Sequence, residues 1–377
     1  MKSQLDWIRP GGLQLLGFGY NYAALLVLLV SQNMGSCKSN VVESGVTKTP
    51  LAQTNGDFGA INTNVSNSVP DFAEAKFRAD LGDRHAQANL GIMYLKGDGI
   101  KQDYAEAAKW LRKAGEQGDA QSQHNLGVLY EDGKGVVQNY DEALDWYRKA
   151  AAQGSAESAV NIGVMYYHGT GVTQNNHEAA IWFRKAAELG SATACDYIGF
   201  MYDKGRVAST NSLESVHWYK KAAEMGDAWA QNALGLKYSK GDGVNQDYDE
   251  AIRWWQKAAE QGKAESQSHL GFLYLNGRGV EKDPKEAVRW FRKAANYGYS
   301  PAQLNLGVCL IAGMGVDRNP AEAYKWLSLA AKNGESKAKV AMDRFFDGIS
   351  PEEIADGKRQ AAAFQPKPEP VKSPFPE

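Results

Sequence analysis

Histidine, cysteine and serine build most catalytic and metal-binding sites, so their spacing is the first question. The six histidines stand at unrelated places: His85, His124, His168, His177, His217 and His269. No two are four residues apart, the spacing that would bring two imidazoles to one face of a helix for zinc. G-x-S-x-G and H-E-x-x-H motifs are also absent. The sequence therefore predicts scattered surface histidines, no catalytic residues, no metal site and no cofactor.

The strongest regularity is a tryptophan that recurs every 36 residues. These tryptophans are Trp110, Trp146, Trp182, Trp218, Trp254, Trp290 and Trp326. A glycine keeps the same step at Gly91, Gly127, Gly163, Gly199, Gly235, Gly271 and Gly307. No insertion or deletion breaks the register, so we predict seven repeats of one structural unit. The formal net charge of −2 gives no general reason to expect nucleic acid or an anionic surface as a partner.

Each unit predicts two helices joined by short turns. Paired glycines, such as Gly97 and Gly99, end the first helix because they permit positive φ. An Asp or Asn begins the second helix, and a Glu follows three residues later, which predicts an N-cap with a capping box. These N-caps are Asp103, Asn139, Asn175, Asn211, Asp247, Asp283 and Asn319. Another glycine, Gly118 in the first unit, ends the second helix.

The residues that repeat indicate the core. Counted from the glycine of the first helix, position −1 is always Leu or Ile, position −5 is Ala or Ser, and position +3 is Tyr in six of seven units. On the second helix an Ala follows the Trp by four residues, as Ala114 follows Trp110. One helix pair cannot bury such faces alone. Stacked pairs can, so the pattern favours a solenoid.

Residues 84–334 repeat the pattern A-x-x-x-L-G-x-x-Y-x-x-G-x-G-V-x-x-D-Y-x-E-A-x-x-W-x-x-K-A-A-x-x-G. This pattern resembles the Sel-one-like repeat (SLR) family, a relative of tetratricopeptide repeats. The resemblance implies an all-α fold, a right-handed α-solenoid of antiparallel helix pairs, and adaptor or scaffold work in protein complexes. Unit four departs from the pattern at Val207 and Ser212, where we expect a locally different loop.

Composition and end signals divide the chain. We predict a signal peptide or membrane anchor at 1–37, a flexible linker at 38–70, the solenoid at 71–349, a capping helix at 350–364 and a disordered Pro-rich tail at 365–377. Residues 71–81 resemble a degenerate second helix, and Ser350 with Glu353 forms a helix-start signal. The N-terminus predicts export to the periplasm or cell envelope, possible membrane attachment, and a possible lipoprotein site at Cys37.

Two further cysteines, Cys195 and Cys309, lie three repeats apart, and we predict that both are buried free thiols. This distinguishes the chain from the cysteine-rich branch of the family, whose units each carry a disulfide and some of whose members are described as β-lactamases. A weak β-lactamase-type hydrolase is therefore kept only as an alternative. A third reading is self-association through the ends of the array.

Basic residues recur on the second helices: Arg112, Arg148, Arg184, Lys220 and Arg292, with Lys113, Lys149, Lys185, Lys221, Lys257 and Lys293. We interpret them as a solvated outer face, because glutamates partly balance them and no aromatic stacking motif for nucleic acid accompanies them. No nucleic-acid partner is predicted.

The variable positions of the first helix predict the binding surface. Positions −6, −3 and +4 change freely, and by analogy with tetratricopeptide folds this side lines a concave groove. Position −2 is Asn in four units, so its side chains could hydrogen-bond an extended peptide or serve local contacts between helices. Trp229 lies outside the repeated Trp register and could anchor a partner or pack on the neighbouring unit. The predicted binding residues of a non-catalytic scaffold are Asn89, Asn125, Asn161, Tyr197, Trp229, His269 and Asn305.

Overall fold

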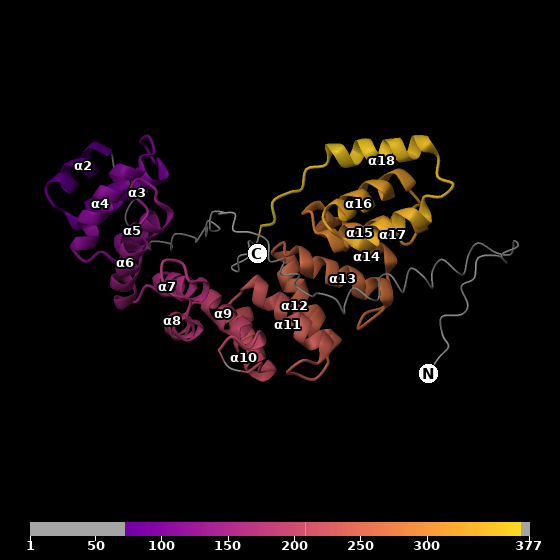
Figure 1. The fold of residues 1–377 in the computed structure, drawn as a ribbon, viewed down its shortest axis with the longest axis horizontal. Helices are drawn as coiled ribbons and strands as arrows, with labels where there is room; N and C mark the ends of the chain where they lie inside the picture. The colour runs from indigo at the N-terminus through magenta and orange to yellow at the C-terminus, as the bar shows by residue number, and fades with distance from the viewer. Residues whose placement is uncertain (1–71, 208, 371–377) are drawn as a thin grey trace, which may run out of the picture. The chain divides into compact units, whose positions relative to one another are not determined.

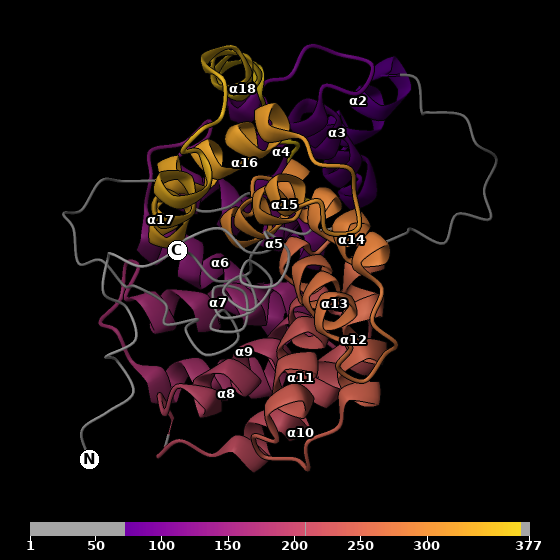
Figure 2. The same cartoon turned by 90° about the vertical axis from the view of Figure 1, so that its right-hand side faces the viewer.

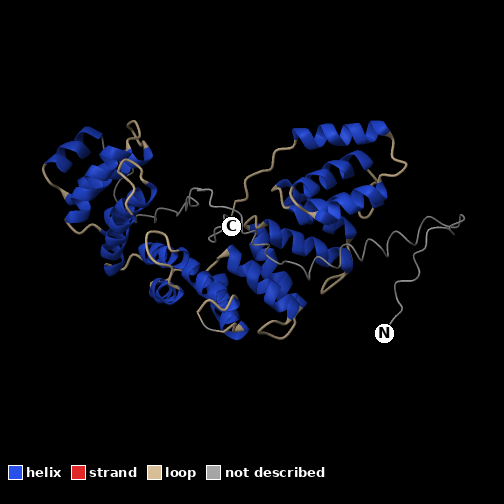
Figure 3. Cartoon of the chain, in the orientation of Figure 1, coloured by secondary structure: helices blue, strands red, loops and turns tan. Residues whose placement is uncertain are grey.

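The computed structural model describes residues 72–370 except residue 208, and every regular element in that part of the chain is a helix (Figures 1 and 3). An N-terminal unit contains α2 to α12, and a C-terminal unit, residues 264–369, contains α13 to α18. Successive helices within each unit pack on one another in chain order. The fold is an all-α solenoid, as the repeat predicts.

The N-terminal unit has the following helices: α2 (Phe72–Asp80), α3 (Arg84–Lys96), α4 (Tyr104–Glu116), α5 (Ala120–Asp132), α6 (Tyr140–Ala152), α7 (Ala156–His168), α8 (Asn176–Glu188), α9 (Ala192–Asp203), α10 (Ser212–Glu224), α11 (Ala228–Lys240) and α12 (Tyr248–Glu260). The C-terminal unit has α13 (Ala264–Asn276), α14 (Pro284–Asn296), α15 (Ser300–Ala312), α16 (Pro320–Lys332), α17 (Ser336–Phe345) and α18 (Pro351–Ala363).

The predicted N-caps of the second helices are confirmed, but their capping boxes are not. Asp103 accepts hydrogen bonds from the backbone N–H groups of Ala105 and Glu106. Its own N–H, which a boxed glutamate would bind, already donates to the carbonyl of Tyr94 at 3.0 Å. Glu106 therefore turns to the indole Nε1 of Trp110 at 3.1 Å. The same bond joins Glu142 to Trp146 and Glu322 to Trp326, whereas the indole N–H groups of Trp254 and Trp290 have no partner among the described residues.

The glycine of each first helix permits a close approach to the second helix of its unit. A Cβ built on Gly163 would lie 2.6 Å from the ring of Phe183, and one on Gly127 would lie 2.6 Å from the ring of Tyr147. Real Cβ atoms essentially never come so close to another heavy atom. The repeated Gly is therefore required by packing inside the pair, since both rings are fully buried.

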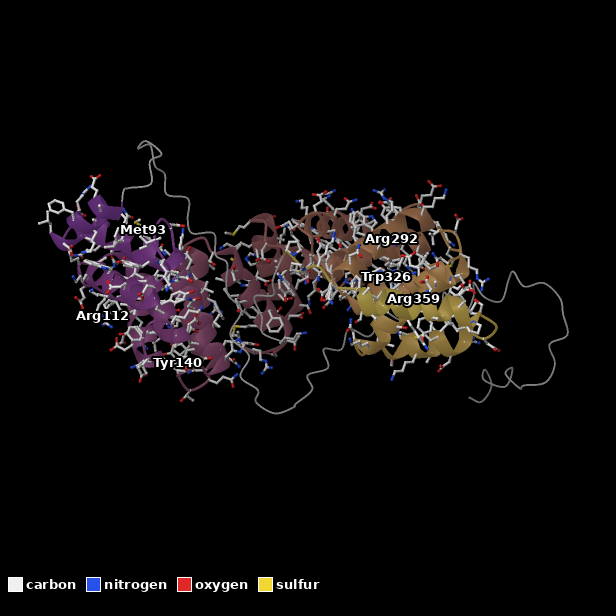
Figure 4. The ribbon with its side chains drawn as sticks, turned by 90° about the horizontal axis from the view of Figure 1, so that it is seen from above. Met93, Arg112, Tyr140, Arg292, Trp326 and Arg359 are labelled. Carbon is white, nitrogen blue, oxygen red and sulfur yellow. The ribbon has the colours of Figure 1, made fainter. Side chains whose placement is uncertain are left out.

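The basic residues of the second helices bind aromatic rings. The lysine three residues after the Trp lies over its indole, with Lys149 Nζ 3.8 Å from the ring centroid of Trp146 and Lys293 Nζ 4.0 Å from that of Trp290. Arg112, labelled in Figure 4, donates to the hydroxyl of Tyr130. The repeated Lys and Arg thus cover the outer edge of the core through their stems and cation–π contacts.

Unit four differs in its loop, as predicted. Helix α9 ends at Asp203, its C-cap is Lys204 with φ −93° instead of a left-handed glycine, and it is one residue shorter than the other first helices of the repeats. On the next first helix, Lys237 stands where the other repeats have Met, Leu or Cys. Its side chain is 7% exposed, and its ammonium binds Asp203 at the end of α9 and Asp242 at 2.7 Å. A buried ion-pair group therefore joins repeats four and five.

Helices outside the seven repeats cover both ends of the array. Helix α2 packs on α3, and α18 lies against α16 (Figure 2). Ser350 and Glu353 form the capping box of α18 that the sequence predicts. The helices α16 and α18 approach closely at Gly357, where an added Cβ would stand only 2.7 Å from the Cβ of Tyr324. Helix α17 was not predicted separately.

Cys195 and Cys309 are buried free thiols, as predicted. Burial raises the pKa of Cys309 to about 12, so this thiol is inert as a nucleophile at neutral pH. The predicted signal or anchor segment 1–37, the linker 38–70 and residues 371–377 of the tail lie outside the described residues. Among the helices that are described, none has the length and apolar character needed to cross a membrane.

Candidate functional site

The residues at position −2 have very different exposures. Asn89 is exposed, and Asn161 and His269 are half-buried. Asn125, Tyr197 and Asn305 are only 4%, 2% and 2% exposed. Tyr197 stacks on Phe183 with ring centroids 4.5 Å apart. The peptide-binding role of this ladder stays a prediction, and its buried members contribute to packing in the described structure.

Trp229, at position −6 of α11, is half-buried and lies against Lys263. The Nζ of Lys263 is 3.2 Å from the centroid of the indole ring, a close cation–π contact. Lys263 itself is only 1% exposed. The prediction that Trp229 could pack within the chain therefore holds for the side of its indole that faces Lys263. Part of the indole is still accessible to solvent.

Asp196, at position −3 of α9, was missed by the sequence reasoning. It is 1% exposed, and its Oδ2 atom has no hydrogen-bond partner among the described residues. Burial raises the pKa of this carboxyl well above its usual value; the carboxylate of Asp227 raises it further, and the ammonium of Lys263 lowers it. The signal that could have found it is an acid at a position where other units carry Ala, His, Val, Asn, Ser or Leu.

The carboxylate of Asp227 caps α11 by accepting from the N–H of Ala230 at 2.9 Å. Burial raises its pKa too, and the hydrogen bonds from the backbone of Ala230 and Trp229 oppose that rise. Asp196, Asp227, Trp229 and Lys263 therefore form one group of two acids, an indole and an ammonium, which we call the acid–indole cluster. It joins α9, α11 and the chain after α12 within the N-terminal unit.

Two other variable positions hold half-buried polar side chains. His124, at position −3 of α5, lies 2.9 Å through Nδ1 from the hydroxyl of Ser158. Burial lowers the pKa of His124, and the charge of Glu157 opposes this. His124 is therefore half-buried, and its imidazole has a polar partner on the next first helix. Ser158 is fully buried, so this pair offers no accessible nucleophile.

Glu131, at position +4 of α5, accepts a hydrogen bond of 2.6 Å from the hydroxyl of Tyr147. Burial raises the pKa of Glu131, and the bond from Tyr147 partly offsets that rise. Positions −6, −3 and +4, whose variability predicts the binding surface, hold the side chains of Trp229, His124, Asp196, Glu131 and Asp203. Within the described residues, no group of His, Cys, Asp and Glu side chains could hold a metal ion.

Comparison with known proteins identifies the repeat. The Sel1 repeat model matches residues 84–119, 120–155, 156–191, 192–227, 230–263, 264–299 and 300–335. The chain belongs to the Sel1-repeat family. A search of curated proteins finds no match.

Two solved Sel1-repeat structures are similar to this chain. One is a protective antigen present in uropathogenic Escherichia coli strains, with an SLR fold, 34% identity and a TM-score of 0.68. The match covers 78% of this chain and 65% of the antigen, so this chain spans less than two thirds of that protein. The other is a Sel1 repeat protein from Oxalobacter formigenes, with 33% identity, a TM-score of 0.63, and 72% and 80% of the two chains covered.

Sel1-repeat proteins generally mediate protein–protein interaction, and solenoids of this family are typically non-catalytic. Against the regular Sel1 pattern, Asp196, Lys237 and Lys263 stand out. Asp196 and Lys237 are charged where the other repeats have uncharged residues or a histidine, and Lys263 stands where most first helices have a capping residue. The match to the repeat model is also shortest here, at 230–263.

Proposed function

We propose that this Sel1-repeat array is a non-catalytic scaffold that binds a protein segment on the first helices of its N-terminal unit, with Trp229 and Asp196 as anchors. The observation that carries the proposal is the buried carboxylate of Asp196, one oxygen of which has no partner among the described residues. An unsatisfied buried charge lowers stability, and such costs persist at binding sites.

The chemistry of the acid–indole cluster favours a partner that brings hydrogen-bond donors. A backbone N–H, a lysine or an arginine could satisfy Asp196, and an apolar side chain beside it could cover the accessible part of the indole. Tryptophan is enriched among residues whose loss most weakens interfaces. Burial next to Asp227 and Lys263 holds the cluster in one geometry before the partner arrives, which reduces the entropy lost on binding.

The predicted −2 ladder extends this surface along the array. Asn89 and Asn161 remain accessible enough to bind the backbone of an extended segment. We further propose that the protein is exported to the periplasm or cell envelope through residues 1–37. The short apolar run at 23–30 after Lys2 and Arg9 supports this location.

Cross-linking in intact cells with mass spectrometry would identify the partner and, from the mature N-terminal peptide, the fate of residues 1–37. The affinity of the identified partner would then be measured for purified variants. Trp229→Ala should weaken binding about thirtyfold or more, since an anchor of this type contributes about 2 kcal/mol or more. Asp196→Asn should weaken it by a smaller factor.

The control is Val137→Ala, an exposed residue of the loop before α6. This variant should bind as the unmodified chain does. If Trp229→Ala and Asp196→Asn both leave the partner's affinity unchanged while circular dichroism shows intact helices, the partner binds elsewhere and the proposal fails.

A further inference from the structure

The chain does not leave the array after its last helix. Phe364, the first residue after α18, packs edge-on against Trp326 with ring centroids 5.1 Å apart, and Lys325 Nζ lies 5.1 Å from the centroid of the Phe364 ring. Figure 4 labels Trp326 within the C-terminal unit. The following residues, 365–369, have no regular secondary structure and stay on this unit. Composition alone predicts a disordered tail here.

Two hydrogen bonds hold this segment to the repeats. The backbone N–H of Lys367 donates to the carbonyl of Asn296, the last residue of α14, at 2.9 Å. The carboxylate of Glu369 accepts from the N–H of Ala264, the first residue of α13, at 3.0 Å. A carboxylate at a helix N-terminus satisfies a free amide and interacts favourably with the helix dipole.

The bond to Glu369 supplies what the sequence before α13 cannot. The residue before each first helix is usually its cap: Asp83, Asp119, Ser155, Ser191, Asp227 and Glu335 all accept from the amides of their own helices. Before α13 this residue is Lys263, whose ammonium only donates hydrogen bonds. The tail therefore brings an acid to the one first helix of the seven repeats that begins after a lysine.

A glycine makes room for the tail. Gly298, which ends the turn after α14, has φ +89°, and a Cβ there would stand 3.3 Å from the Cβ of Pro366. Gly334 occupies the equivalent place one repeat later with the same φ, and nothing lies within 4 Å of its Cβ position. The two glycines carry the same backbone constraint, and only Gly298 has the tail beside it.

The same contact recurs in the N-terminal unit. A Cβ on Gly262 would lie 2.7 Å from the ring of Pro370, while Gly190 and Gly226 have nothing within 4 Å. Gly262 and Gly298 are equivalent residues 36 apart, and Pro370 and Pro366 are four apart. The tail thus places Pro366 beside Gly298 and Pro370 beside Gly262, so that four tail residues separate the contacts with two consecutive repeats.

We propose that the first turn of α13, the carbonyl of Asn296 and Gly298 form a second peptide-binding site, specific for an extended segment of the pattern Pro-x-x-Glu. Residues 366–369, Pro-Lys-Pro-Glu, are its resident ligand. A partner that carries the same pattern binds by displacing the tail. Proline favours the extended conformation before binding, and the glutamate fixes the register by capping α13.

Attachment to the same chain makes the tail a strong competitor. A short tether gives a bound segment an effective concentration in the millimolar range. A free peptide of the same sequence therefore binds the unmodified chain weakly, and binds tightly only when the attached tail is weakened. This competition distinguishes a ligand site from a contact that merely fixes the end of the chain.

The test uses the full chain and a fluorescent peptide with the sequence of residues 364–377, read by fluorescence anisotropy. Glu369→Lys in the chain should tighten binding of the unmodified peptide about fivefold or more, the factor expected for loss of one helix cap. Val137→Ala, at an exposed residue of the loop before α6, is the control and should leave peptide binding unchanged. A peptide with Gln in place of Glu369 should bind the Glu369→Lys chain about fivefold more weakly.

Two further chains locate the peptide. In the Glu369→Lys background, Gly298→Asn should weaken peptide binding several-fold, while Gly334→Asn, at the same φ, should not. Equal peptide affinity for the unmodified and Glu369→Lys chains would overturn the proposal, as would loss of binding in both glycine variants. Loss of peptide binding through Trp229→Ala would place the peptide on the first-helix surface, and it too would overturn this second site without affecting the scaffold proposal.

Discussion

Replacing Asp196 by asparagine should stabilise the protein at neutral pH. The carboxylate is 1% exposed, one of its oxygens has no partner among the described residues, and a second carboxylate, Asp227, is close enough to raise its pKa. An unsatisfied buried polar atom costs about 1–3 kcal/mol, and more when it is charged. Asparagine keeps the shape and removes the charge, so we expect a gain of about 1–3 kcal/mol at pH 7. For a unit of this size each kcal/mol corresponds to a rise of roughly 2–4 °C in the melting temperature.

The pH dependence gives the sharper test. The pKa of Asp196 is raised in the folded state above its usual value of 3.8, so the folded protein holds this proton more strongly than the unfolded chain. The stability contributed by Asp196 is therefore present below pH 3.8 and is lost as pH rises through the folded pKa. Asp196→Asn has no such loss, so its advantage should disappear near pH 3 and grow as the pH rises towards 7.

Urea unfolding followed by circular dichroism at pH 7, 5 and 3 measures this difference. Asp145→Asn is the control, because Asp145 is exposed and its ion pair with Arg148 is long, at 3.6 Å. It should change stability by less than about 0.5 kcal/mol at each pH. If Asp196→Asn lowers stability at pH 7, or if its effect is the same at pH 7 and pH 3, the carboxylate is not the uncompensated charge inferred here.

Two more predictions concern the repeats. Gly163→Ala should destabilise the protein by about 1–3 kcal/mol, since the new methyl would lie 2.6 Å from the ring of Phe183. Gly115→Ala should stabilise the protein by about 0.5–1 kcal/mol, because the new Cβ meets nothing closer than 3.3 Å and the other repeats have Ala at this position. If both variants change the free energy of unfolding in the same direction in chemical denaturation, the packing argument is wrong. Lys237→Met should change the free energy of unfolding by less than about 1.5 kcal/mol, because half-exposed Asp203 and Asp242 return to water. The double variant Asp203→Asn with Asp242→Asn should lower the free energy of unfolding by about 3–5 kcal/mol, because it leaves the buried ammonium of Lys237 without its carboxylate partners. A smaller loss of stability in this double variant than in Lys237→Met would refute this account.

The helices and their ends could be predicted because their signals are local. The Asp or Asn that begins each second helix accepts from amides two or three residues away, and the glycines that end the first helices need only their own φ. The capping boxes were wrong for a reason that is not local. The carbonyl of Tyr94, nine residues before Asp103, takes the N–H that the glutamate would bind, and the tryptophan takes the glutamate.

Of the residues predicted to bind a partner, only Trp229 belongs to the acid–indole cluster, and its binding role stays a prediction. Variability marked positions −6, −3 and +4, and the structure places Trp229, Asp196 and Glu131 there. Sequence could not show that Asp196 is buried beside Asp227, or that Lys263 lies on Trp229, because each contact joins residues far apart in the sequence that only the packed helices bring together. Most lysines of the basic ladder are exposed, as predicted, but their contacts with the indoles could not be predicted because these rings become neighbours only in the folded helix.

The sequence by itself determined the repeat, its helices and its family, because a 36-residue pattern of glycine, tryptophan and caps has few ways to bury its apolar faces. The tertiary structure decided which charges are buried and where the tail goes. Glu369 caps α13 from 105 residues away, and no periodicity relates those two places. Local patterns fix elements, whereas burial and partner choice depend on which distant residues the finished solenoid brings into contact.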